Sequence, residues 1–292
     1  MHSDSAMLTG SEHYRVAECG EDYALHGQHG DRAWGVVSDG CSEGGRSDVG
    51  ARMWAMAVDS AIRSNDSQMM EAVFEGGNFA RAMSRLTPAL LTGAGEADML
   101  ATVCCVVADK RRAAGILCGD GALLAIYANG AVEMVSHNFT RNMPFYPWYL
   151  SSQSFIESFI RRSSEMGQSM EIVRQVWDSN GYTVEEGSIV VPIDGNLRFM
   201  GASYPFPLRD EAGGMKLKAL LAVTDGIFSR PDRNVAAEDT IRELCGFKSW
   251  SGSFIRRRLG ALGAKWMKES TAARDDLSAA GICWPEFAEQ DA

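Results

Sequence analysis

Three Asp-Gly pairs in the sequence each follow directly on an apolar run. They lie in the segments GVVSDG, GILCGDG and LLAVTDG, which place carboxylates at Asp39, Asp120 and Asp225. An apolar run that ends at Asp-Gly is typical of a buried strand entering a turn. A side chain at such a strand end leaves the core while its backbone stays fixed. Two further acidic pairs stand at the starts of predicted strands: Glu21-Asp22 and Asp275-Asp276.

The chemistry of such a set depends on whether the carboxylates meet. Isolated carboxylates at close range repel one another and raise each other's pKa, so a cluster is stable chiefly when divalent cations neutralise it. Oxygen ligands in a chain with only five histidines favour Mg²⁺ or Mn²⁺ over zinc. One Asp-Gly pair alone is a common turn, so the prediction of a metal site depends on the joint pattern.

Apolar runs and breaks predict the elements that would position these residues. A hairpin is expected over 21–27 and 33–40, and an antiparallel meander over the runs 99–109, 113–121, 122–130 and 131–135. Further strands are expected at 218–226 and 275–283. Helical spacing predicts helices over 48–65, 78–91, 235–245 and 252–268. Within 137–216 we expect a helical piece near 152–178 and a short strand, SIVVPI.

Composition and charge limit the class of protein. The chain has 292 residues with 28 Lys+Arg against 38 Asp+Glu, a net charge of −10 that argues against nucleic acid or an anionic membrane as partner. No signal peptide and no run of about 18 apolar residues is seen. Seven cysteines without a CxxC pair indicate a reduced, cytoplasmic protein. Without repeats or linkers, residues 1–292 are predicted to form one domain with an insertion at about 137–216.

Five segments of the sequence resemble, in order, the motifs of metal-dependent protein phosphatases of type 2C, especially the bacterial subgroup. These segments are CGEDYAL, VVSDGCSEGGRSDVGA, LATVCCVVADKRRAAGILCGDG, LLAVTDGIFS and ARDDLSAAGI. The resemblance covers about residues 10–135 and 217–283. It implies an α+β fold, a four-layer αββα sandwich of two mainly antiparallel sheets flanked by helices, with a binuclear metal centre at one end.

The resemblance also implies a role for each matching residue. Asp39 matches the carboxylate that bridges two Mn²⁺ or Mg²⁺ ions, and Gly40 the residue whose carbonyl oxygen binds the second. Asp225 and Asp275 match the other ligands of the first ion. Glu21 matches the side-chain ligand of the second ion, with Asp22 beside it in an outer role. Asp120 matches the position that holds a third, weaker ion in bacterial members.

The activity implied is hydrolysis of phosphoserine and phosphothreonine in proteins by a metal-bridging hydroxide, without a covalent intermediate. The partners implied are a phosphoprotein substrate and a cognate kinase, and the chain is expected to be a monomer. Two alternatives from other classes stay open. One is a non-catalytic regulator that binds phosphoproteins, and the other is a metal-dependent phosphoesterase acting on a small molecule.

The sequence departs from the family pattern at two positions. Ala17 stands where many members have an arginine that holds the substrate phosphate, and His13 or Arg15 is the candidate replacement. Cys41 stands where many members have a histidine, a candidate general acid. A thiol is a poor acid for an alkoxide leaving group at neutral pH, so we expect His13 or a metal-bound water to donate that proton.

The segment that replaces the usual flap of the family contains an aromatic cluster: Phe145, Tyr146, Trp148 and Tyr149. Two interpretations stay open: these side chains pack in the core, or some of them border the substrate groove.

Overall fold

The strands of the computed structural model pair antiparallel in two sheets. The structure describes residues 1–16, 20–76, 79–90, 95–180, 182–193, 201–208, 216–229, 237–271 and 273–288. The seven-stranded sheet has the order β1 (His2–Leu8), β12 (Leu277–Cys283), β11 (Leu217–Val223), β6 (Gly121–Tyr127), β7 (Val132–Phe139), β8 (Ser169–Trp177) and β9 (Thr183–Pro192). The five-stranded sheet has the order β10 (Gly201–Phe206), β5 (Ala113–Cys118), β4 (Val103–Ala108), β3 (Arg32–Ser38) and β2 (Tyr23–His29).

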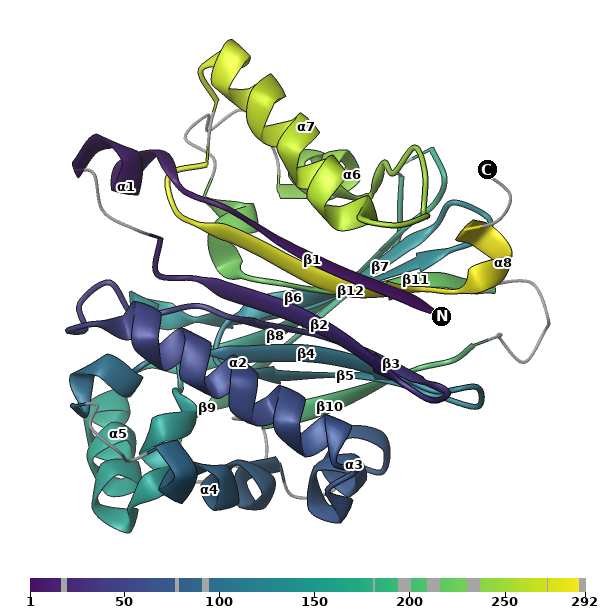
Figure 1. The fold of residues 1–292 in the computed structure, drawn as a ribbon. Coiled ribbons are helices and arrows are strands. Elements are labelled where there is room, and N and C mark those ends of the chain that lie inside the picture. Colours follow the sequence, from purple (N-terminus) through teal and green to yellow (C-terminus); the bar gives the residue numbers. More distant parts are fainter. Residues whose placement is uncertain are drawn as a thin grey trace.

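Helices cover the outer faces of both sheets. The α-helices are α1 (Ser11–Val16), α2 (Ser47–Arg63), α3 (Ser67–Phe74), α4 (Phe79–Leu90), α5 (Gln153–Glu165), α6 (Ala237–Cys245), α7 (Phe254–Glu269) and α8 (Pro285–Ala288). Short 3₁₀ turns are η1 (Ala97–Met99), η2 (Thr140–Asn142), η3 (Pro147–Ser151) and η5 (Asp225–Phe228). In Figure 1, α2 to α5 lie on the side of the five-stranded sheet, and α6 and α7 lie beyond the other. The predicted four-layer α+β fold is confirmed.

Three layers of buried side chains hold these elements together. Between the sheets, Val37 on β3 packs in one cluster with Leu123 and Leu220 of the other sheet. On the outer face of β3, Trp34 packs in a cluster with Trp54 of α2. The period of two along a strand thus sends neighbouring residues into different cores. The strands β4, β5, β6 and β12 are nearly continuous apolar runs because both of their faces are buried.

The predicted meander over 99–135 is wrong at one connection. β4 and β5 pair in the five-stranded sheet, whereas β6 and β7 pair in the seven-stranded sheet, so the chain changes sheets between Cys118 and Gly121. Gly119 and Gly121 have φ angles of +96° and +118°, which residues with a side chain rarely adopt. A Cβ on Gly121 would also lie 2.8 Å from the Cys104 sulfur. The corner therefore requires glycine, and it leaves Asp120 between the sheets.

The predicted helix near 152–178 is wrong in its second half. The helix α5 ends at Glu165, and residues 169–177 form strand β8, paired with β7 and β9. The segment SMEIVRQVW has apolar residues on both faces of the strand, which hides the alternation that identifies a strand. The structure also contains β1 and α1, which the sequence analysis did not predict. The prediction of a single domain with an insertion stays a prediction.

A buried carboxylate on β1 holds helix α7 against the seven-stranded sheet. Oδ2 of Asp4 accepts hydrogen bonds from the backbone N–H groups of Ile255 and Arg256, at 2.7 and 3.0 Å. These N–H groups belong to the first turn of the helix and have no partner within it. A carboxylate there satisfies both groups and suits the positive end of the helix dipole.

None of the described helices is an apolar segment of the length a bilayer requires.

His137 on β7 links the two sheets and makes stability depend on pH. Its Nε2 atom lies 2.6 Å from the hydroxyl of Tyr204 on β10, and burial lowers the pKa of His137 from 6.5 to about 4. Between these values the unfolded chain binds a proton that the folded protein excludes, so stability falls as the pH falls. We expect this group to lower the free energy of unfolding by roughly 2 kcal/mol from pH 7 to pH 5.

Urea unfolding of the wild type and of His137→Gln at both pH values measures this effect. The glutamine keeps a polar group near Tyr204 but does not titrate, so its variant should lose less stability between pH 7 and pH 5. An equal loss in both proteins would contradict the assignment.

Candidate metal centre

The three Asp-Gly carboxylates meet at one end of the sandwich. Asp39 follows β3, Asp120 lies between β5 and β6, and Asp225 follows β11 by one residue. Antiparallel pairing brings the end of one strand beside the start of the next, so these positions share an edge. Each of the three carboxylates offers an oxygen atom within 4.8 Å of the other two. All three residues are half-buried. The convergence expected from the sequence is therefore present.

The backbone around Asp39 is fixed by the neighbouring chain segment before β4. The N–H of Asp39 donates to the hydroxyl of Thr102 at 3.2 Å, and the N–H of Thr102 donates to the Asp39 carbonyl at 2.8 Å. Gly40 forms an isolated bridge with Ala101. Thr102 was not predicted as a site residue, because nothing in the sequence shows which strand lies beside Asp39.

Asp22 lies against Asp39 and is held by the residue before Asp225. The hydroxyl of Thr224 donates to Oδ2 of Asp22 at 2.8 Å, and it accepts from the N–H of Ser278 at 2.9 Å. Asp22 is buried, and its side chain contacts that of Asp39. Asp22 was expected in an outer role beside Glu21, and its contact with Asp39 is compatible with that role, which stays a prediction.

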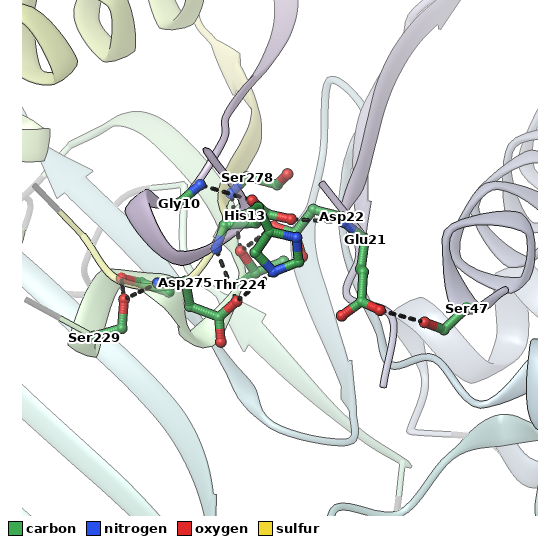
Figure 2. Close-up of polar contacts among 11 residues, drawn as sticks. Gly10, His13, Glu21, Asp22, Ser47, Thr224, Ser229, Asp275 and Ser278 are labelled. Atoms are coloured by element: carbon green, nitrogen blue, oxygen red, sulfur yellow. Dashed lines mark hydrogen bonds and ion pairs between the residues drawn. The ribbon is translucent and has the colours of Figure 1, made fainter. Parts of the chain in front are cut away.

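Glu21 and Asp275 flank the cluster, as Figure 2 shows for their polar contacts. Oε1 of Glu21 accepts from the Ser47 hydroxyl at 3.1 Å, at the start of α2. The N–H of Asp275 donates to the hydroxyl of Ser229 at 3.2 Å. His13 on α1 places its Nε2 atom 4.0 Å from Oδ1 of Asp275. Both predicted flanking ligands thus lie at the same end of the molecule as the cluster.

The carboxylates of this cluster resist ionisation. Burial is the main cause, and it raises the pKa of Asp22 to about 7 and that of Asp225 to about 6. Burial raises the pKa of Asp39 and Asp120 as well, and the neighbouring carboxylates add to the rise. For Asp275, burial again raises the pKa, while His13 opposes the rise. A positive charge among these groups would favour the ionised forms.

Two oxygen atoms of the cluster are buried without a hydrogen-bond partner in the part of the chain that the structure describes. They are Oδ1 of Asp22 and Oδ1 of Asp120. A buried carboxylate oxygen without a donor is costly unless a proton or a cation satisfies it. Several carboxylates with free oxygens are the donor set that Mg²⁺ and Mn²⁺ prefer. The residues present therefore fit divalent cations.

Asp276 holds the backbone of two segments beside the carboxylate cluster, a role that the sequence analysis did not predict. It is buried, and its two oxygens accept from the N–H of Gly10 at 2.7 Å and from the N–H of Glu21 at 2.6 Å. These bonds tie the segments before α1 and before β2 to the start of β12. The Asp-Asp pair in the sequence signalled acidity here, but only the fold shows that the second aspartate binds backbone.

The structure shows where the residues lie that depart from the family pattern or were expected to compensate for it. His13 lies on helix α1, and its Nε2 atom is near Asp275. Arg15 belongs to the same helix, but its side chain and residue Ala17 lie outside the described part of the chain. Cys41 is half-buried, and its thiol lies beside the hydroxyl of Tyr146. The ligand and catalytic roles of the predicted residues stay predictions.

The structure supports core packing for the aromatic cluster Phe145, Tyr146, Trp148 and Tyr149, and a place at the substrate groove stays a prediction. Phe145 and Trp148 are buried in the core beneath α2 and α4. Tyr146 is buried too, but its hydroxyl reaches Cys41 beside the carboxylates. Burial raises the pKa of Tyr146, and Cys41, Asp120 and Asp39 act in the same direction, so this hydroxyl stays protonated.

Comparison with known proteins identifies the family. Residues 9–254 match the model of the family described as protein phosphatase 2C. This match covers most of the chain, so the chain belongs to the protein phosphatase 2C family, and the resemblance found in the motifs is confirmed. In a comparison with curated proteins, no match was found.

Solved structures agree with the fold. A bacterial serine phosphatase has a TM-score of 0.54 at 13% identity, over 97% of this chain and 97% of that one. The serine/threonine phosphatase Stp1 from Staphylococcus aureus has a TM-score of 0.54 at 12% identity, over 97% and 95%. The phosphatase domain of SpoIIE from Bacillus subtilis, solved with a fragment of its regulatory domain, has a TM-score of 0.52 at 12% identity, over 97% and 63%. At these identities the likeness concerns the fold.

Proposed function

We propose that this protein is a Mn²⁺- or Mg²⁺-dependent phosphatase that hydrolyses phosphoserine and phosphothreonine in proteins. The observation that carries the proposal is the convergence of Asp39, Asp120 and Asp225, whose oxygens lie within 4.8 Å of one another. Membership of the protein phosphatase 2C family and the fold shared with bacterial serine phosphatases support it. The substrate would be a phosphoprotein modified by a partner kinase.

Residues of the chain would divide the work as follows. Asp39 and Asp225 would hold one cation, with Asp275 as a further ligand. Glu21 and the Gly40 carbonyl would serve a second, and Asp120 a third. When bound, such cations lower the pKa of water and neutralise the charge that develops on a phosphoryl group. Asp22 and Thr224 would fix the positions of Asp39 and Asp225 relative to each other, because Thr224 precedes Asp225 and donates to Asp22, which contacts Asp39.

Hydrolysis assays test the proposal directly. With Mn²⁺ present, the purified protein should hydrolyse p-nitrophenyl phosphate and a phosphoserine peptide, and excess EDTA should remove both activities. A phosphotyrosine peptide of the same sequence should be a much poorer substrate. Hydrolysis of small phosphate esters without peptide turnover would favour a small-molecule phosphoesterase, and metal-dependent peptide binding without turnover would favour a phosphoprotein-binding regulator.

His13 is the described residue best placed to replace the phosphate-binding arginine of the family. Its ring is largely buried and lies beside Asp275. We expect His13→Ala to raise KM for p-nitrophenyl phosphate about tenfold while kcat changes little, because a group that only orients phosphate binds ground state and transition state alike. Steady-state kinetics from pH 6 to pH 9 measure both constants. A larger fall in kcat, with a changed pH profile, would make His13 a proton donor instead.

A further inference from the structure

A cavity of about 500 Å³ opens beside the metal centre and shares two of its carboxylates, Asp120 and Asp225. The rest of its wall comes from β7, β8, η5 and Ser229, and its residues Met134 and Val173 lie on the face of the seven-stranded sheet that packs against α6 and α7. Because it begins at the carboxylates, a phosphorylated residue bound at the centre would place its chain neighbours at this cavity.

The strands present their side chains to the cavity in register. Ser136 on β7 pairs with Val173 on β8, and Met134 pairs with Gln175. All four line the cavity, as alternation along both strands requires. Two are apolar and two are uncharged polar groups. The amide of Gln175 is turned toward β9, where it donates to Glu186 at 2.9 Å.

The segment η5 joins the cavity to the chemistry. Asp225 begins this 3₁₀ turn and Phe228 ends it, and both residues line the cavity. Residues three apart in a 3₁₀ turn lie on the same side, so the aromatic ring and the carboxylate share a face. Val173 and Phe228 are partly exposed apolar side chains that pack against the buried cluster between the seven-stranded sheet and helices α6 and α7. The apolar part of the wall thus reaches the metal-binding carboxylates.

We propose that this cavity binds the side chain of a residue next to the phosphoserine or phosphothreonine of the substrate, and that it selects an uncharged apolar side chain such as leucine. The inference rests on the proposed function. Four apolar side chains line part of the cavity (Met134, Phe139, Val173 and Phe228), and burying a leucine side chain against them is favourable. A glutamate at the same place would lose its hydration without gaining a basic partner from the wall, because among the described residues no lysine, arginine or histidine lines the cavity.

Phosphoserine peptides that differ only in the residues flanking the phosphoserine test this selection. On one side of the phosphoserine, either before or after it, leucine should raise kcat/KM about tenfold over glycine. This is the ratio expected when a leucine side chain is largely buried. With glutamate, kcat/KM should lie below that of the glycine peptide. Equal values for leucine, glycine and glutamate on both sides would overturn the inference while leaving the phosphatase proposal intact. Absence of hydrolysis of every peptide and of p-nitrophenyl phosphate would overturn both.

Two variants connect the selection to the cavity. Val173→Lys puts a cation into the wall and should abolish the tenfold preference for leucine over glycine. Ile189→Lys makes the same change at an exposed residue on the opposite face of the sheet, paired with Ile172, and should keep the preference. Gln175→Lys repeats the test should Val173→Lys fail to fold, as judged by its melting temperature. Retention of the full preference in a folded cavity variant would overturn the inference.

Discussion

Asp39→Asn should lose Mn²⁺-dependent hydrolysis of p-nitrophenyl phosphate by at least about 10²–10³-fold while remaining folded. Asp39 contacts Asp22 and lies at the centre of the carboxylates that would hold the cations. Without metal, the same substitution removes a carboxyl group whose ionisation is opposed by burial and by the neighbouring carboxylates, at a cost to the stability of the folded protein. The variant in EDTA should therefore melt above the wild type in EDTA, whereas Mn²⁺ should raise the melting temperature of the wild type alone.

The matched control for this substitution is Asp31→Asn. Asp31 is an exposed carboxylate in the β2–β3 turn, paired with Lys110 at 2.9 Å, far along the sheet from the cluster. Its loss should change neither turnover nor the stabilisation by Mn²⁺, because exposed ion pairs contribute little. Near-wild-type turnover in Asp39→Asn would refute the assignment of the site.

Asp276→Ala should lower both stability and activity. The substitution leaves the buried N–H group of Gly10 and the partly buried N–H group of Glu21 without an acceptor, and each such loss costs about 1–3 kcal/mol. We expect the free energy of unfolding to fall by roughly 3 kcal/mol. Glu21 would also lose its fixed position, so kcat should fall at saturating Mn²⁺ and the Mn²⁺ concentration for half-maximal activity should rise.

Asp4→Ala separates the two effects. Asp4 also accepts two backbone N–H groups, but at the start of α7 and away from the carboxylate cluster. Urea unfolding should show a comparable loss of stability in this variant, while its Mn²⁺ dependence and kcat should match the wild type at a temperature where it is folded. If Asp276→Ala and Asp4→Ala behave alike in the activity assay, Asp276 has only a structural role.

Much of the architecture follows from the sequence because the central strands of both sheets are buried on two faces. The runs around β3, β4 and β11 are continuously apolar and stop at Asp-Gly or at charged turns, so their positions were predictable. β1 was not, because its own side chains are only partly buried and its pairing with the wholly buried β12 maintains it. Strand β8 was mistaken for helix because apolar residues occur on both of its faces.

The candidate site was predictable as a set of residues but not as a geometry. The repeated Asp-Gly after an apolar run identifies Asp39, Asp120 and Asp225, and antiparallel pairing explains why they meet. The supporting residues lie in no such sequence motif. Thr102 and Asp276 matter only because folding places them beside Asp39 and Glu21, and the change of sheet at Gly119 and Gly121 determines where Asp120 lies.

Anomalous diffraction from a crystal grown with excess Mn²⁺ tests the central claim most directly. The claim is that folding gathers these carboxylates to bind divalent cations. We predict at least two manganese peaks, one of them within bonding distance of both Asp39 and Asp225, and loss of that peak in Asp39→Asn. A well-ordered wild-type crystal with no manganese bound to these carboxylates would contradict the account.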